Sequence, residues 1–97
     1  MKQLTVFCNR DEEERVVAAF DHAGIPSYLR VGDATGHRFL DPGQIPRDMT
    51  WEATLFVVPA VSEERMSAAV KELRAYAGKC EFEPCLRVVI SPVDEVY

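Results

Sequence analysis

The sequence predicts a ferredoxin-like β-α-β-β-α-β fold of the α+β class, with two helices on one face of a four-stranded antiparallel sheet. Apolar residues follow strand patterns in four segments and helical spacing in two, in the order strand, helix, strand, strand, helix, strand. The chain has 97 residues, the size of one domain. Its composition, 47% hydrophobic and 28% charged residues, is that of a globular protein. We therefore expect a single domain over residues 1–97.

The first strand and the first helix are expected before residue 25. Residues 4–8 place an apolar side chain at every second position, which is the period of a strand. The acidic run 11–14 suits the positively polarised start of a helix, with Asp11 as the expected N-cap. Apolar residues then recur at helical spacing, at Val16, Val17, Phe20 and Ala23. Gly24 predicts the end of this helix.

The later elements are predicted by the same signals. A short strand is expected at residues 27–31 and a clear one at residues 52–58, where Pro59 is expected to end it. Ser62 is the expected N-cap of the second helix. Its apolar stripe contains Met66, Ala69, Val70, Leu73 and Ala77. A last strand is expected at residues 86–90.

Between the second and third strands, the stretch from Gly32 to Trp51 has neither strand nor helix periodicity. We therefore expect a long loop at about 32–51, and loops beyond about 12–15 residues are commonly functional or disordered. It is either a mobile recognition loop that orders on a ligand or partner, or a tolerated insertion. At its base stand a hydroxyl, a glycine, an imidazole and a guanidinium. Together these groups can hold an anion such as phosphate or bicarbonate: Thr35, Gly36, His37 and Arg38.

Both faces of the predicted sheet are apolar near its centre. Leu55 and Val57 line one face of the third strand. Phe56 and Val58 point to the other. Because two helices cover only one face, the second apolar face is expected to be an interface. We expect a homo-oligomer that buries it, although the C-terminal tail, residues 93–97, offers an alternative cover.

Three cysteines and one histidine are candidates for special chemistry. Cys80 and Cys85 flank a short turn, where two thiols can form a reversible disulfide or offer two soft ligands to a divalent metal. They can equally be ordinary reduced thiols, one of them facing the core. Cys8 falls on the strand pattern and is expected to be a buried apolar residue. His22 is expected to place favourable charge at the end of the first helix.

Charge and motif content exclude several functions. The formal net charge is −5 and no basic stripe stands out, so we expect no nucleic-acid partner. Met1 is not followed by the apolar core of a signal peptide, and the longest apolar run, residues 55–61, is too short to span a membrane. We expect a cytoplasmic protein that does not insert into membranes. Hydrolase motifs such as G-x-S-x-G and H-E-x-x-H are missing, so we expect no enzymatic activity.

Several segments resemble the PII signalling family and its PII-like relatives. Their order and spacing carry the resemblance, which covers nearly the whole chain. The matching segments are Met1-Lys2-Gln3-Leu4-Thr5-Val6, Ala23-Gly24-Ile25-Pro26, Thr35-Gly36-His37-Arg38, Leu55-Phe56-Val57-Val58-Pro59 and Ser91-Pro92-Val93-Asp94-Glu95-Val96.

The resemblance implies a compact homotrimer that binds an adenine nucleotide (ADP, AMP or ATP) in the clefts between subunits. It also implies a long loop that docks on a target protein, such as a membrane transporter. Carried over to this chain, the ligand-binding residues are Thr35, Gly36, His37, Arg38, Gly78 and Lys79. Arg87 is a substitute for the basic C-terminal segment that the family has and this chain lacks.

The chain also departs from the family pattern, because residues 80–85 replace most of its Gly-rich turn after the second helix. It therefore resembles a divergent PII-like regulator whose ligand is an adenine nucleotide or a small anion such as bicarbonate. Similarity to CutA-like trimers of the same fold gives an alternative. In that hypothesis the chain is a metal- or redox-responsive module that uses Cys80 and Cys85.

Overall fold

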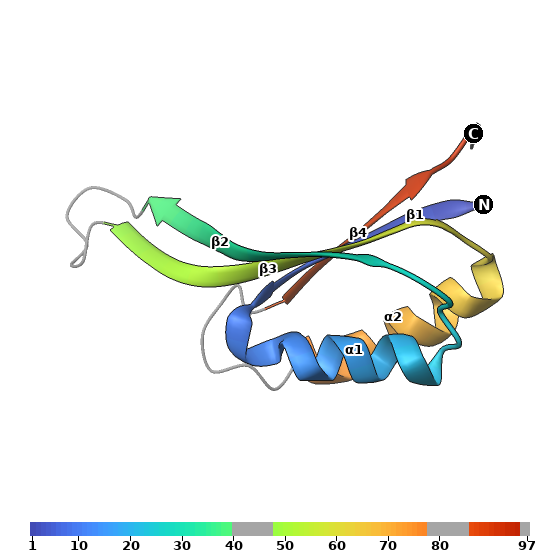
Figure 1. The fold of residues 1–97 in the computed structure, drawn as a ribbon, viewed down its shortest axis with the longest axis horizontal. Helices are drawn as coiled ribbons and strands as arrows, with labels where there is room; N and C mark the ends of the chain where they lie inside the picture. The colour runs from blue at the N-terminus through green and yellow to red at the C-terminus, as the bar shows by residue number, and fades with distance from the viewer. Residues whose placement is uncertain (40–47, 78–85, 96–97) are drawn as a thin grey trace.

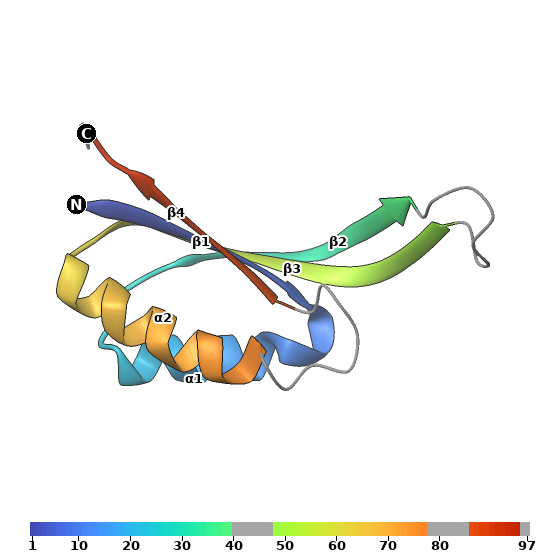
Figure 2. The same ribbon diagram turned by 180° about the vertical axis from the view of Figure 1, so that it is seen from behind.

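The structure is a computed structural model that describes residues 1–39, 48–77 and 86–95. In chain order, its elements are β1 (Lys2–Asn9), a 3-10 turn (Arg10–Glu12), α1 (Glu13–His22), β2 (Leu29–Phe39), β3 (Asp48–Val61), α2 (Glu63–Ala77) and β4 (Leu86–Pro92). The four strands form one antiparallel sheet in the order β2-β3-β1-β4. Both helices lie under one face of the sheet (Figures 1 and 2). The predicted ferredoxin-like fold is confirmed.

The core lies between the helices and the covered face of the sheet. The sheet contributes residues of alternating positions, because every second side chain points to the helices. Phe56 is fully buried there and makes an edge contact with Phe20 of α1, with ring centroids 5.8 Å apart. The largest buried apolar side chains of the core are Phe20, Phe56, Leu4, Leu73, Val6, Val16 and Val58. Cys8 is also buried, as predicted.

The helix ends follow the sequence signals with one exception. The Ser62 hydroxyl accepts a hydrogen bond from the Arg65 backbone N–H at 3.4 Å, which confirms the predicted N-cap of α2. Gly24 ends the α1 region with a φ of +73°, a conformation that glycine adopts without strain. Asp11 is not a cap, because it lies inside the 3-10 turn that precedes α1. The acidic run therefore begins one turn earlier than the α-helix does.

The predicted loop at about 32–51 is corrected by the structure. Residues 32–39 continue β2 and residues 48–51 begin β3, so the two strands form a long hairpin that extends beyond the rest of the sheet (Figure 1). Gly32 and Gly36 suggested turns of a loop, but Gly32 lies in a β-bulge and Gly36 packs against Trp51. β3 also continues through Pro59 to Val61. Pro59 falls at an irregularity in the pairing with β1, where a missing N–H is tolerated.

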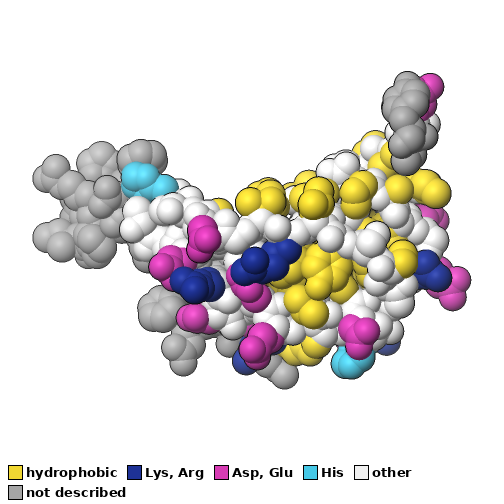
Figure 3. Space-filling view, in the orientation of Figure 1, with side chains coloured by type: hydrophobic (Ala, Val, Ile, Leu, Met, Phe, Trp, Pro, Cys, Tyr) yellow, Lys and Arg dark blue, Asp and Glu magenta, His cyan; other side chains and the backbone are white. Residues whose placement is uncertain are grey.

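The other sheet face is apolar and uncovered in the described part of the chain, as predicted. Phe7 is 47% exposed and Val89 is 46% exposed. Leu29 and Val31, on the same face, are more exposed than either of them. Figure 3 shows a row of hydrophobic side chains along this face. The described start of the tail stays beside the N-terminus, where the Val93 N–H donates to the Met1 carbonyl. We call this surface the open face.

Candidate functional site

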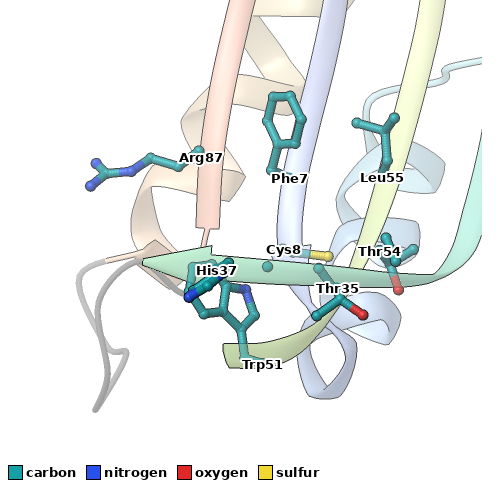
Figure 4. Close-up of a pocket in the computed structure, with 11 residues that line it drawn as sticks. Phe7, Cys8, Thr35, His37, Trp51, Thr54, Leu55 and Arg87 are labelled. Carbon is teal, nitrogen blue, oxygen red and sulfur yellow. The ribbon is translucent and has the colours of Figure 1, made fainter. Parts of the chain in front are cut away.

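A pocket of about 410 Å³ lies on the open face where the long hairpin leaves the sheet. Four strands build it. Its lining consists of residues 34–37 of β2, Trp51 and residues 53–55 of β3, Phe7 and Cys8 of β1, and Arg87 of β4. Figure 4 shows Phe7 and Leu55 at the end nearer the sheet centre, with His37 and Trp51 at the hairpin end. We call this cavity the arm pocket.

A β-bulge sets the shape of the arm pocket. Val31 pairs with Leu55 and Ala34 pairs with Ala53, so Gly32 and Asp33 together oppose a single residue of β3. Asp33 has a φ of +56°, which a short polar side chain tolerates better than a bulky one. A bulge bends its strand and reverses which residues face each side beyond it. The extra residue therefore brings the even-numbered positions of β2, including Gly36, onto the open face.

Gly36 and Trp51 are directly opposite each other on β2 and β3. A Cβ atom built on Gly36 would overlap the Trp51 indole ring, so the ring occupies the space that a side chain would need. Trp51 is the single tryptophan of the sequence. The sequence interpretation missed Trp51 as a site residue, because a glycine–aromatic pair is visible only once the strand register is known. The glycine fixes the aromatic wall of the arm pocket.

Four of the predicted ligand-binding residues meet in the arm pocket: Thr35, Gly36, His37 and Arg87. Arg38 continues β2 and pairs through its backbone with Met49. Gly78, Lys79, Cys80 and Cys85 lie outside the described residues.

Arg87 is the cationic group of the arm pocket. Its side chain extends from β4 away from the other labelled residues in Figure 4, so the residue lines the edge of the cavity and its guanidinium points outward. No hydrogen bond or ion pair links it to any other residue that the structure describes. The interior beside it is formed by Phe7, Leu55 and Trp51. Aromatic and aliphatic walls next to one available guanidinium suit a ligand with an apolar or planar body and an anionic group.

A charged pair, Arg30 and Glu13, lies on the helix side of the sheet, opposite the arm pocket. Arg30 of β2 donates three hydrogen bonds to Glu13 of α1, from Nε to Oε2 at 3.1 Å and from Nη2 to Oε1 at 2.7 Å and to Oε2 at 2.8 Å. The buried Thr54 hydroxyl donates to the same Glu13 carboxylate. These hydrogen bonds hold the pKa of Glu13 below its usual value. Glu13 is therefore a carboxylate at neutral pH.

Cys8 contributes to the pocket lining but is not a reactive group. Burial, followed by the charges of Glu13 and Glu12, raises the pKa of its thiol to about 11. The nucleophile and metal ligand of cysteine chemistry is the thiolate, which is scarce at neutral pH when the pKa is this high. Cys8 acts as an apolar wall.

The described residues give no support to a metal centre. Within them, no group of three or more His, Cys, Asp or Glu side chains could hold a metal ion. His22 instead joins the two helices through a contact of 2.9 Å between its Nδ1 and Glu72 Oε1. No helix in the described ranges is long and apolar enough to cross a membrane.

Comparison with solved structures places this fold among PII-like proteins. The first neighbour is CPII, a nitrogen regulatory PII-like protein from Thiomonas intermedia K12, bound to ADP, AMP and bicarbonate. It has 18% sequence identity and a TM-score of 0.66, with 99% of this chain and 94% of CPII covered. CPII bound to ADP and bicarbonate gives 19% identity and a TM-score of 0.65, with 97% of this chain and 88% of that chain covered.

A second PII protein has the same fold. The B. subtilis GlnK–ATP complex has a TM-score of 0.72 at 9% identity, covering 92% of this chain and 77% of GlnK. No family model matches the chain, and no curated protein matches it. The similarity is therefore one of fold, which this chain shares with CPII and GlnK.

Proposed function

We propose that this chain is a PII-like regulatory protein that senses an adenine nucleotide or bicarbonate in the arm pocket. The observation that carries the proposal is the pocket itself, in which residues from the base of the long hairpin meet Trp51, Phe7 and Arg87. Its fold neighbour CPII is bound to ADP, AMP and bicarbonate, and GlnK is in complex with ATP. A planar base would lie against the aromatic wall, and the phosphates or bicarbonate would bind Arg87.

We propose further that the protein is a cytoplasmic homotrimer without enzymatic activity. The open face supports assembly, because an exposed apolar sheet face is more stable when another subunit covers it. Assembly would also add residues of a neighbouring subunit to a pocket that opens on this face. The hairpin extends away from the sheet, where it would contact a target protein such as a membrane transporter (Figure 1).

Trp51 provides a direct test, because the single tryptophan lies in the pocket wall. Titration with ADP, AMP, ATP and bicarbonate in turn is expected to change its fluorescence with at least one of them. The Arg87→Gln variant is expected to weaken nucleotide binding roughly tenfold, because hydrogen bonds to charged groups contribute about 1.5–3 kcal/mol. Arg74→Gln, which removes a similar charge from the exposed side of α2, is the matched control.

Two results would contradict the proposal. One is that none of the four compounds changes the fluorescence or the melting temperature, since any ligand of the folded state raises apparent stability. The other is nucleotide binding that Arg87→Gln and Arg74→Gln leave equally strong, which would place the site elsewhere.

A further inference from the structure

The outer part of the β2–β3 hairpin has few contacts with the rest of the molecule. Ala53 is the first residue of β3 that pairs with β1, at Asn9. Among the described residues, positions 35–39 and 48–52 therefore pair only with each other. We call these residues the arm. A two-stranded ribbon is marginally stable and free to twist, so its direction depends on what holds its base.

Glu13 is the group that holds this base. It is the first residue of α1, and it binds one side chain from each strand of the hairpin: Arg30 of β2 and Thr54 of β3. Arg30 lies just before the bulge, and Thr54 is the residue that the bulge opposes. The carboxylate thus joins the two strands at the point where the hairpin bends.

The Arg30 guanidinium, which binds Glu13, lies close to the bulge residue Gly32. A Cβ atom on Gly32 would lie 2.9 Å from the Arg30 Nη1 atom, so the guanidinium passes close to Gly32 and would have to shift if that residue had a side chain. Asp33, the other bulge residue, adopts a positive φ. The Arg30–Glu13 pair is a fork of three hydrogen bonds, and its side chains are 48% and 21% exposed. Such bidentate pairs fix geometry more firmly than single contacts do.

A second ion pair joins the 3-10 turn before α1 to the arm, and it is weaker. Arg10 of the 3-10 turn and Glu52 of the arm form an ion pair at 3.0 Å, but their side chains are 61% and 74% exposed. Exposed pairs contribute little, because water and salt screen them. Glu13 is therefore the principal link between α1 and the base of the hairpin, from which the arm extends.

We infer that Glu13 is a positioning residue, which sets the direction of the arm and the shape of the arm pocket from behind the sheet. Thr54 connects the Glu13 contacts with the arm pocket, because it lines the pocket and its hydroxyl donates a hydrogen bond to Glu13. Trp51 lies three residues before Thr54 on the same strand, toward the outer end of the hairpin. Loss of the Glu13 contacts releases the bend at the bulge and moves the aromatic wall, although Glu13 itself does not line the pocket.

This link also couples the pocket to α1, a consequence that rests on the proposed function. If a ligand binds more tightly when the Glu13 contacts are formed, the same ligand must stabilise those contacts, since coupling between sites is reciprocal. Hydrogen exchange at the first turn of α1, which the ligand does not touch, is then expected to slow when the pocket is filled. Exchange in α2 is the internal reference.

The first experiment needs no ligand. Acrylamide quenching of Trp51 fluorescence is measured in the full chain and in the Glu13→Gln, Arg30→Lys and Glu12→Gln variants. Arg30→Lys keeps the charge but removes the fork. Glu12→Gln is the matched control, because Glu12 pairs with Arg15 in the adjacent turn and makes no hydrogen bond or ion pair with the described residues of β2 or β3. Glu13→Gln and Arg30→Lys are expected to increase quenching, whereas Glu12→Gln matches the unaltered protein.

A charge-exchanged double variant, Glu13→Arg with Arg30→Glu, keeps the test decisive if a single variant does not fold. It is expected to return quenching toward the original value, which a merely local loss of stability would not do. Equal quenching in Glu13→Gln, Arg30→Lys and Glu12→Gln, with far-ultraviolet circular dichroism unchanged, would overturn the inference.

The second experiment separates this inference from the proposed function. For any nucleotide that binds the unaltered protein, Glu13→Gln is expected to weaken binding by about fivefold or more, the usual range of coupling between sites. If no nucleotide binds but quenching rises as expected, the positioning role stands and the proposed ligand fails. If nucleotides bind and neither quenching nor affinity changes in Glu13→Gln, the proposed function stands and the positioning role fails.

Discussion

The two faces of the sheet are both apolar, but they serve different purposes. On the covered face, β1 and β3 place Val6 and Phe56 opposite each other, sealed by the helices. On the open face, the next pair along is Phe7 and Leu55, and it forms part of a pocket. Adjacent residues of one strand thus belong one to the core and the other to the pocket. Burial, not hydrophobicity, distinguishes the faces.

The strongest test of this contrast replaces a phenylalanine on each face. Phe56 is 0% exposed and Phe7 is 47% exposed. Phe56→Ala is expected to lower the free energy of unfolding by about 3–5 kcal/mol, because it removes buried surface and leaves a cavity. Phe7→Ala, compared at a subunit concentration where both variants are monomeric, is expected to cost about 1 kcal/mol or less. Urea denaturation measures both, and equal losses would break the contrast.

Assembly provides the next test. A carboxylate at position 7 would have to lose its water if another subunit covers the open face, even with Arg87 opposite it on β4, and removing a charge from water costs several kcal/mol per ion. Phe7→Glu is therefore expected to shift the proposed trimer to monomer in sedimentation velocity. Val17→Glu, which alters an exposed apolar residue on the helix side, is expected to leave the assembly unchanged. A monomer before any substitution, or a trimer that survives Phe7→Glu, would contradict this use of the open face.

The covered and open faces also differ in how far the sequence could predict them. Period two on β1, together with the Ser62 cap and the Gly24 stop, was enough to place the core and the order of elements. The open face followed from the same alternation, since Leu55 and Val57 had to point away from Phe56. Alternation and capping signals were enough for these features, because each depends on residues that are close together in the sequence.

The hairpin could not be predicted in this way. Gly32 and Gly36 have the sequence appearance of turns, yet one belongs to a bulge and the other packs against Trp51. Both assignments depend on the register between β2 and β3, which is a long-range property. Of the candidate anion-binding segment, Thr35, Gly36 and His37 line the pocket, and whether they bind an anion stays a prediction. Glu13 was interpreted only as part of a helix-starting acidic run, because its partners Arg30 and Thr54 are distant in sequence.

A smaller effect is expected at the glycine of the pocket. Gly36→Ala would place a methyl group inside the Trp51 ring position, and overpacking of this kind typically costs about 1–3 kcal/mol. The indole is expected to move into water, with a red shift of its emission and weaker ligand binding. Thr50→Ala, at an exposed position next to Trp51 and outside the pocket lining, is the control. Unchanged emission in Gly36→Ala would show that the glycine is not needed for this wall.

The smallest expected effect concerns Cys8, which lies where the covered face and the pocket meet. Folding raises the pKa of its thiol from 9.0 to about 11, so the folded state keeps a proton that the unfolded state loses. Stability is unaffected below pH 9 and falls as the pH rises between those two values, because the folded state then binds more protons. The Cys8→Ala variant lacks this contribution. Urea denaturation of both proteins at about pH 8 and pH 10 is expected to show a steeper loss in the unaltered protein. Parallel losses would mean that the thiol ionises as readily in the folded chain as in the unfolded one, and that the boundary between the two faces admits water at Cys8.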